Sequence, residues 1–227
     1  MVISGFEKLT LLDYPGKTAC LVFTQGCNFR CPFCHNKDLL CNGCDSKFKE
    51  EEIFDYLEKR KGLIDGVCIT GGEPLLQKDI EKFILKIKEM GFLVKLDTNG
   101  SNPDKLSRLI KLVDYVAMDI KNDFLDYGKT SGVEKINIDN IKRSIKIIEE
   151  SDVEHEFRTT VVKQLHNLEK LMDICNYLGP NARYYIQNYK DCDTVLSKGL
   201  TGFDNKELED YKEKLNVLYP NVVIRGM

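Results

Sequence analysis

The fold is decided by residues 67–97, which read VCITGGEPLLQKDIEKFILKIKEMGFLVKLD. The two ends of this stretch, Val67–Thr70 and Phe92–Asp97, are short apolar runs of the kind that forms buried strands. Between them, apolar residues recur at helical spacing from Ile80 to Ile87. A strand, a helix and a second strand of these lengths form a βαβ unit, and its right-handed crossover makes the two strands parallel.

The same alternation continues on both sides of this stretch. Further strands are expected at Ala19–Phe23, Tyr115–Ile120, His155–Val162, Tyr184–Gln187 and Val222–Arg225. Further helical faces are formed by Ile141, Ile145 and Ile148, by Leu168, Leu171, Met172, Cys175 and Leu178, and by Leu208, Tyr211, Leu215 and Leu218. About six βα units fit into 227 residues, whereas a complete eight-unit barrel typically needs about 250. We therefore expect one α/β domain over residues 1–227, built as a partial (β/α)6 TIM-like barrel, with a doubly wound open sheet as the alternative.

The charge balance and the cysteine count narrow the function classes. The chain has 36 acidic and 33 basic residues and a net charge of −3, so no overall positive field attracts nucleic acid. The first ten residues lack a basic segment followed by an apolar one, and nowhere do about 18 apolar residues run together. A cytoplasmic protein without membrane contact is therefore expected. In such a chain, nine cysteines indicate metal binding before they indicate disulfides.

Five of the cysteines lie close together, directly after the strand expected at residues 19–23. Cys27, Cys31 and Cys34 have the spacing C-x3-C-x2-C. Three thiolates suit a [4Fe–4S] cluster with one iron open to a ligand that is not protein, whereas structural zinc prefers a closed set of four ligands. The alternative is zinc, because Cys31 and Cys34 also form a C-x2-C-x6-C-x2-C set with Cys41 and Cys44.

These cysteines, with Phe33 ahead of the third, resemble the signature of the radical S-adenosylmethionine (radical SAM) enzymes. The surrounding stretches 13–17 (DYPGK) and 23–28 (FTQGCN) resemble the activating proteins of anaerobic ribonucleoside-triphosphate reductase, which are glycyl-radical-enzyme activases. The resemblance is strong in the N-terminal half and covers the last third only at isolated positions. It implies a partial barrel of the radical SAM type, with Cys27, Cys31 and Cys34 as ligands of a [4Fe–4S] cluster and S-adenosylmethionine (SAM) as the second cofactor.

Further motifs lie at the carboxyl ends of predicted strands, where α/β folds collect their sites. They are Gly71-Gly72-Glu73-Pro74, Asp97-Thr98-Asn99-Gly100 and Asp119-Ile120-Lys121, with Arg158 inside the fifth strand. Taken alone, the first two are compatible with ordinary turns, the first with an exposed glutamate, and Arg158 is compatible with an interior ion pair or a surface position. The resemblance implies instead that they bind SAM, and the predicted contacts are Gly71, Gly72, Glu73, Asp97, Asn99, Asp119, Lys121 and Arg158.

Some residues receive no role from this pattern. His166, just before a predicted helix, is typical of a solvated residue near a helix cap. Cys20 and Cys68 lie within predicted strands and are expected to be small buried hydrophobes. No role is indicated for Cys41, Cys44, Cys175 and Cys192, and no oligomeric state is indicated.

The resemblance implies an enzyme that reductively cleaves SAM at the cluster and produces a 5′-deoxyadenosyl radical. That radical would remove a Cα hydrogen from a glycine of a partner glycyl radical enzyme, with anaerobic ribonucleotide reductase as the first candidate and a flavodoxin or ferredoxin as electron donor. No catalytic side chain is designated. One alternative is a small-molecule radical SAM enzyme such as a 7-carboxy-7-deazaguanine synthase, although the Gln-Gly-Glu run expected before the cysteines is absent. The other is a zinc-binding module without catalysis.

Overall fold

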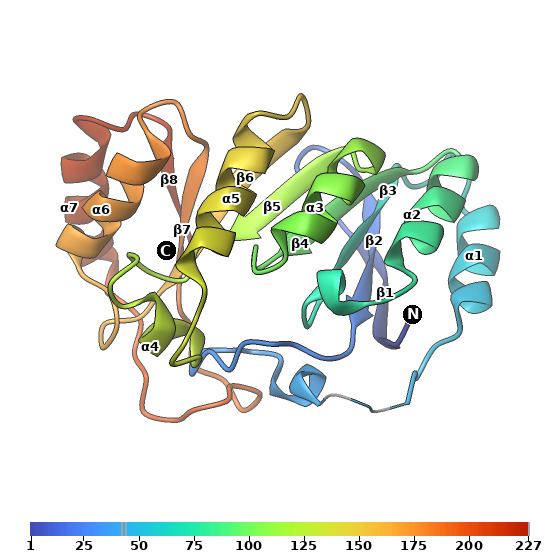
Figure 1. The fold of residues 1–227 in the computed structure, drawn as a ribbon, viewed down its shortest axis with the longest axis horizontal. Coiled ribbons are helices and arrows are strands. Elements are labelled where there is room, and N and C mark those ends of the chain that lie inside the picture. The colour runs from blue at the N-terminus through green and yellow to red at the C-terminus, as the bar shows by residue number, and fades with distance from the viewer. Residues whose placement is uncertain (42, 44, 227) are drawn as a thin grey trace. The chain divides into compact units, whose positions relative to one another are not determined.

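The computed structural model describes residues 1–41, 43 and 45–226 of this α/β protein (Figure 1). The chain forms two compact units. The first consists of residues 1–28, 38–117 and 139–154, and the second of residues 29–37, 118–138 and 155–227. Strand β5 (Tyr115–Asp119) contributes residues to both units.

The first unit is built on four strands and the beginning of β5. β1 (Ile3–Thr10) is antiparallel to β2 (Ala19–Thr24), whereas β2, β3 (Gly66–Gly71) and β4 (Leu93–Thr98) are parallel to one another. In the register, Ala19 is opposite Gly66 and Gly66 is opposite Leu93. The helices are α1 (Glu50–Glu58), α2 (Ile80–Glu89), α3 (Pro103–Leu109) and most of α5 (Ile138–Glu149), with the short 3-10 helices η1 (Lys37–Leu40), η2 (Pro74–Leu76) and η3 (Ile110–Leu112).

Helix α2 shows why this sequence folds locally as it does. Its predicted apolar face, from Ile80 to Ile87, is buried. Lys86 and Lys88 lie in the last turn, where cations interact favourably with the helix dipole. The Lys88 ammonium also reaches Asp114 at 2.6 Å. The helix is thereby attached to the segment that leads into β5.

The second unit continues the parallel arrangement. β6 (Glu154–Val161), β7 (Tyr184–Asn188) and β8 (Val222–Arg225) are parallel, with Phe157 opposite Tyr184 and Tyr184 opposite Val222. Its helices are α4 (Tyr127–Ser131), α6 (Leu168–Leu178) and α7 (Asn205–Asn216). Helices α6 and α7 lie side by side, and α7 packs against β8 (Figure 1). Asp204 and Glu207 form a capping box that fixes the start of α7.

All seven predicted strands are present, with ends within two residues of the expected ones. The pattern missed β1, because Glu7 and Lys8 give its second half a polar, exposed character. It also missed α1, α3 and α4, which are nine residues or fewer. The assignment of Leu218 to the buried face of α7 is wrong, since the helix ends at Asn216 and Leu218 is exposed. Among the helices that the structure describes, none is long and apolar enough to cross a membrane.

Candidate functional site

In the first unit, Gly71 and Gly72 lie tightly against the end of β2. A Cβ atom on Gly72 would come within 2.0 Å of the carbonyl oxygen of Gly26, and Gly71 has a φ of +107°. The Gly72 N–H donates to the Thr24 carbonyl at 2.8 Å, and the Glu73 N–H donates to the Gly26 carbonyl at 2.8 Å. Glycine is therefore required at both positions, because backbone occupies the space of a side chain.

Glu73 is buried, with only 1% of its surface exposed. One carboxylate oxygen accepts hydrogen bonds from the Leu75 N–H at 3.0 Å and the Thr98 hydroxyl at 2.8 Å. The other accepts one from the Asn99 N–H at 2.7 Å. The interpretation of this motif as a turn with an exposed glutamate is therefore wrong. The carboxylate joins the turn after β3 to the turn after β4.

Asn99 connects that turn to the first cysteine. Its side-chain nitrogen lies 2.9 Å from the Asn28 side-chain oxygen and 4.0 Å from the Cys27 sulfur. Its side-chain oxygen accepts hydrogen bonds from the Ser101 N–H and hydroxyl at 3.0 and 2.6 Å. Within the first unit, the structure thus brings the predicted SAM contacts Glu73 and Asn99 to the predicted cluster ligand Cys27.

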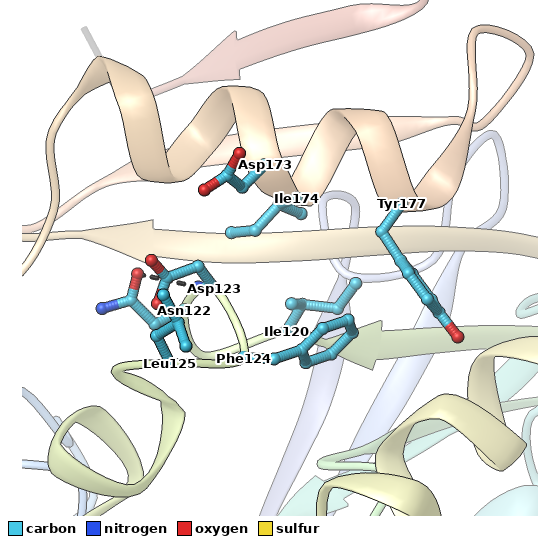
Figure 2. Close-up of a pocket in the computed structure, with 8 residues that line it drawn as sticks. All are labelled: Ile120, Asn122, Asp123, Phe124, Leu125, Asp173, Ile174 and Tyr177. Atoms are coloured by element: carbon cyan, nitrogen blue, oxygen red, sulfur yellow. Dashed lines mark hydrogen bonds between the residues drawn. The ribbon is translucent and has the colours of Figure 1, made fainter.

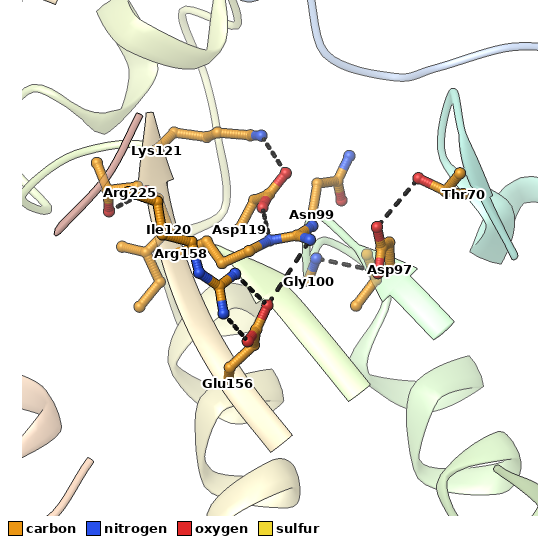
Figure 3. A network of polar contacts seen from close by, with 12 residues as sticks. Thr70, Asp97, Asn99, Gly100, Asp119, Ile120, Lys121, Glu156, Arg158 and Arg225 are labelled. Carbon is orange, nitrogen blue, oxygen red and sulfur yellow. Dashed lines mark hydrogen bonds and ion pairs between the residues drawn. The ribbon is translucent and has the colours of Figure 1, made fainter. Parts of the chain in front are cut away.

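Asp97 lies in β4 and is held by side chains of its own unit. One of its oxygens accepts a hydrogen bond from the Thr70 hydroxyl at 3.1 Å (Figure 3). The other forms an ion pair with Lys95, and the Cys68 sulfur lies 3.9 Å from the same oxygen. Lys95 is buried in the core, which the sequence did not indicate. Cys68 is buried as predicted.

In the second unit, the loop that carries Cys31 and Cys34 packs against the end of α4. The Ser131 carbonyl accepts a hydrogen bond from the Arg30 N–H at 2.8 Å, and the Cys31 sulfur lies 3.8 Å from the same oxygen. Gly132 has a φ of +68°, and a Cβ atom on it would lie 2.2 Å from the Arg30 carbonyl oxygen. Glycine at this position therefore permits the close approach of the loop.

The segment at residues 189–197 covers the other side of the same loop. The Leu196 N–H donates to the Cys34 carbonyl at 3.0 Å, and the Ser197 N–H donates to the Pro32 carbonyl at 2.9 Å. His35 stacks on Tyr189 with ring centroids 5.4 Å apart. These contacts fix the backbone around Cys34.

A network of charged groups extends from the end of β5 through β6 to β8 (Figure 3). Asp119 accepts from the Arg158 Nε at 2.9 Å through one oxygen and from the Lys121 ammonium at 3.0 Å through the other. Glu156 pairs with Arg225 at 3.0 Å and lies 3.9 Å from Arg158. All three predicted contacts, Asp119, Lys121 and Arg158, are therefore neighbours in the second unit.

The pKa values in this network follow from its pairing. Burial would raise the pKa of Asp119, but the charges of Arg158 and Lys121 outweigh it and hold the pKa well below its usual range. Burial would lower the pKa of Lys121, but Asp119 and the Cys31 thiolate raise it above its ordinary value. Asp119 is therefore an anion and Lys121 a cation throughout the physiological pH range.

The sequence missed two members of the network and misjudged a third residue beside it. Glu156 is buried, and Arg225 stacks over the Tyr185 ring at 3.5 Å. His166, expected to be solvated, is also buried. The Val162 N–H donates to His166 Nδ1 at 3.1 Å, so the proton of the neutral ring is on Nε2, which donates to the Lys121 carbonyl at 2.9 Å. Burial lowers the pKa of His166.

A pocket of about 230 Å³ lies between α6 and the loop that follows Lys121 (Figure 2). Its walls are mainly apolar and include Ile120, Phe124, Leu125, Ile174 and Tyr177. Phe124 and Tyr177 meet edge to face with centroids 4.7 Å apart. None of the predicted site residues lines this pocket.

The cysteines without a predicted role have different environments. Cys175 is buried, which raises its pKa to about 12, whereas Cys192 is exposed. Cys44 lies outside the described residues. Within the described part of the chain, no group of three or more His, Cys, Asp or Glu side chains is arranged to hold a metal ion.

The donor types nevertheless suit the predicted cofactors. Cys27, Cys31 and Cys34 are all described and none of them forms a disulfide bond. Thiolates are the protein ligands of iron–sulfur clusters, and Lys121 places a positive charge near Cys31. The two units also offer backbone carbonyls, carboxylates and cationic side chains, which are the groups needed to bind an amino acid and a ribose.

Comparison with known proteins identifies close relatives. Residues 21–178 match the model of the radical SAM superfamily. A Methanocaldococcus jannaschii protein, provisionally assigned as a glycyl-radical enzyme activating enzyme, is 35% identical over 99% of this chain and 95% of its own length. The pyruvate formate-lyase-activating enzyme of Clostridium pasteurianum is 32% identical over 76% of this chain and 75% of its own.

Among solved structures, SuiB of Streptococcus suis has a similar fold. The TM-score is 0.66 at 18% identity, and the match covers 91% of this chain and 48% of SuiB. Together with the superfamily match, this likeness confirms the predicted fold class, an α/β partial barrel of the radical SAM type.

Proposed function

Because the chain belongs to the radical SAM superfamily, we propose that it activates a glycyl radical enzyme by removing a hydrogen from a glycine Cα of that partner. The chain is an enzyme, as predicted, and this superfamily uses the two predicted cofactors, a [4Fe–4S] cluster and SAM. The observation that carries the activase proposal is the 35% identity with the M. jannaschii protein, which extends over almost the whole of both chains.

Cys27, Cys31 and Cys34 would hold the cluster. A bound cluster would supply the electron for reductive cleavage of one S–C bond of SAM, which would release methionine and a 5′-deoxyadenosyl radical. Other groups of the chain hold the cysteine loop in place. Asn99 places an amide beside Cys27, and the backbone contacts of Pro32 and Cys34 with residues 196 and 197 hold the rest of the loop.

Different residues would bind the two charged groups of SAM, its ammonium and its carboxylate. The backbone at Gly71 and Gly72 would meet the ammonium group, since carbonyl oxygens accept from it. Glu73 acts indirectly, because its carboxylate binds groups of its own chain and shapes the two turns. In the second unit Lys121 and Arg158 would bind the SAM carboxylate, and Asp119 holds both cations in place.

We further propose anaerobic ribonucleotide reductase as the partner. The support is the resemblance of stretches 13–17 and 23–28 to the activating proteins of that enzyme. Tyr14, in the first stretch, is buried and packs against Ala19, Tyr115 and Ala117, so this part of the motif is structural. The electron donor, a flavodoxin or ferredoxin, and the cytoplasmic location stay predictions.

The test is direct formation of the radical. Reconstituted protein, reductant, SAM and the large subunit of an anaerobic ribonucleotide reductase from the same source should give a glycyl radical doublet by electron paramagnetic resonance. Replacing the C-terminal glycine of the partner by alanine should remove the signal. A Cys192→Ser variant is the matched control, because Cys192 is an exposed cysteine outside the motif and the signal should persist.

Two results would contradict the proposal. A silent spectrum with intact cluster and cleaved SAM would exclude this partner, and replacement of the reductase by pyruvate formate-lyase would test another. Rapid conversion of a small molecule without any protein partner would favour a 7-carboxy-7-deazaguanine synthase-like enzyme instead.

A further inference from the structure

Lys95 is a charged side chain in the core of the first unit. Only 1% of its surface is exposed, although lysine is rarely buried to this extent. It lies in β4 two residues before Asp97, so both side chains point to the same face of the sheet. Its ammonium forms an ion pair with one Asp97 oxygen.

The neighbours of the ammonium include a cysteine and an aromatic ring. Cys68, the register partner of Lys95 on β3, has its sulfur 3.8 Å from Nζ. The ring of Tyr115 on β5 lies with its centroid 5.9 Å from Nζ. Burial of an ion pair is weak evidence for stability, because loss of hydration offsets the attraction and an apolar pair often serves as well. The stability of the core therefore does not explain a lysine at this position.

We propose that Lys95 is a positioning residue that fixes the Asp97 carboxylate for recognition of the ribose hydroxyls of SAM. This inference rests on the proposed function. Lys95 holds one carboxylate oxygen and the Thr70 hydroxyl holds the other at 3.1 Å, so the plane of the carboxylate is set from both sides. The Asp97 side chain keeps 15% of its surface exposed, which leaves an edge that a ligand can reach.

The charge of the pair determines which group it suits. An ammonium and a carboxylate are neutral together, so the pair offers hydrogen-bond acceptance and little net attraction for a cation. Uncharged hydroxyls are the matching donors. In the proposed function, the ammonium of SAM has other acceptors in the backbone at Gly71 and Gly72.

The experiment is a double-mutant cycle on SAM affinity. Anaerobically reconstituted wild type, Lys95→Met, Asp97→Asn and the double variant are compared by equilibrium dialysis with SAM. Each single variant should bind about tenfold more weakly, and the double variant no more weakly than Asp97→Asn alone, because coupled residues give non-additive effects. Lys95→Arg keeps the charge and should recover most of the affinity.

If Lys95→Met folds poorly, the same four proteins are compared by the thermal unfolding midpoint of their cluster-free forms. That variant leaves Asp97 partly buried without its cation, so its unfolding midpoint should fall. The added Asp97→Asn change removes the uncompensated charge, and the double variant should recover towards wild type.

Additive losses of SAM affinity would overturn the inference, as would unchanged affinity in Asp97→Asn. In both cases wild-type protein still binds SAM, so the proposed function stands. If wild-type protein with an intact cluster binds no SAM, the proposed function and the inference are both wrong.

Discussion

Two carboxylates of the candidate site, Glu73 in the first unit and Asp119 in the second, are held by different means. In the first, Glu73 accepts hydrogen bonds from uncharged donors, the N–H groups of Leu75 and Asn99 and the Thr98 hydroxyl. In the second, Asp119 lies between two cations. Hydrogen bonds from uncharged donors are directional and are little screened by salt, whereas ion pairs weaken as the salt concentration rises. Glu73 therefore fixes the shape of two turns, and the pairing of Asp119 fixes the charges next to it.

The largest expected effect concerns the cysteines, which come from both units. Replacement of Cys27, Cys31 or Cys34 by alanine should each abolish the cluster, because too few protein ligands remain. Iron analysis after anaerobic reconstitution should fall from about four irons per chain to a small fraction. Cys192→Ala should keep the full iron content. A redox-active cluster in all three variants would disprove the assignment of these cysteines as cluster ligands.

The second effect tests the ion-paired region. Glu156→Gln removes the buried anion that Arg225 and Arg158 share. The protein should lose about 3 kcal/mol of unfolding free energy, since breaking one partner of a buried pair leaves a charge uncompensated. Urea unfolding of the cluster-free protein measures it. Glu154→Gln, at an exposed position of the same strand, is the control and should change stability by less than about 0.5 kcal/mol. A loss of the same small size in both variants would show that the network is not held by Glu156.

The third effect tests the hydrogen bonds that the Glu73 carboxylate accepts in the first unit. Glu73→Gln keeps one carbonyl acceptor but places an NH2 group next to an N–H or O–H donor, so the unfolding free energy should fall by about 2 kcal/mol. The loss should be nearly the same at low and high salt, because the donors are uncharged. Glu81→Gln, at an exposed position on α2, is the matched control. A strong salt dependence of the Glu73 effect would mean that charge, and not geometry, is what this carboxylate contributes.

The sequence predicted those features that leave a pattern among neighbouring residues, namely the strands and the candidate site residues that follow them. The strands were found because their apolar runs are buried, and the site residues because glycine and polar residues follow them. The partners that hold these residues were not predicted. Glu156 and Arg225 are 69 positions apart, and their pairing depends on the strand order. In the sequence, Lys95 is simply a polar residue within a predicted strand. Its burial becomes visible only in the structure, where Cys68 on β3 and Tyr115 on β5 lie next to it.

The smallest effect separates two titrating groups of the second unit by pH. His166 has a pKa lowered by burial, so below its unfolded value of about 6.5 the unfolded chain binds a proton that the folded chain does not. Stability should therefore be complete above that pH and fall as the pH drops from about 7 to 5, by at most about 1.4 kcal/mol per pH unit. Asp119 also has a lowered pKa, but its contribution should be lost only below about pH 4, where the unfolded carboxyl takes up its proton. Urea unfolding at pH 7, 6 and 5 should show a shallower decline in His166→Gln than in wild type, whereas Asp119→Asn should differ in slope only below pH 4. Equal slopes for wild type and His166→Gln between pH 7 and 5 would show that His166 does not titrate on unfolding, and the pH dependence would then have to come from elsewhere in the chain.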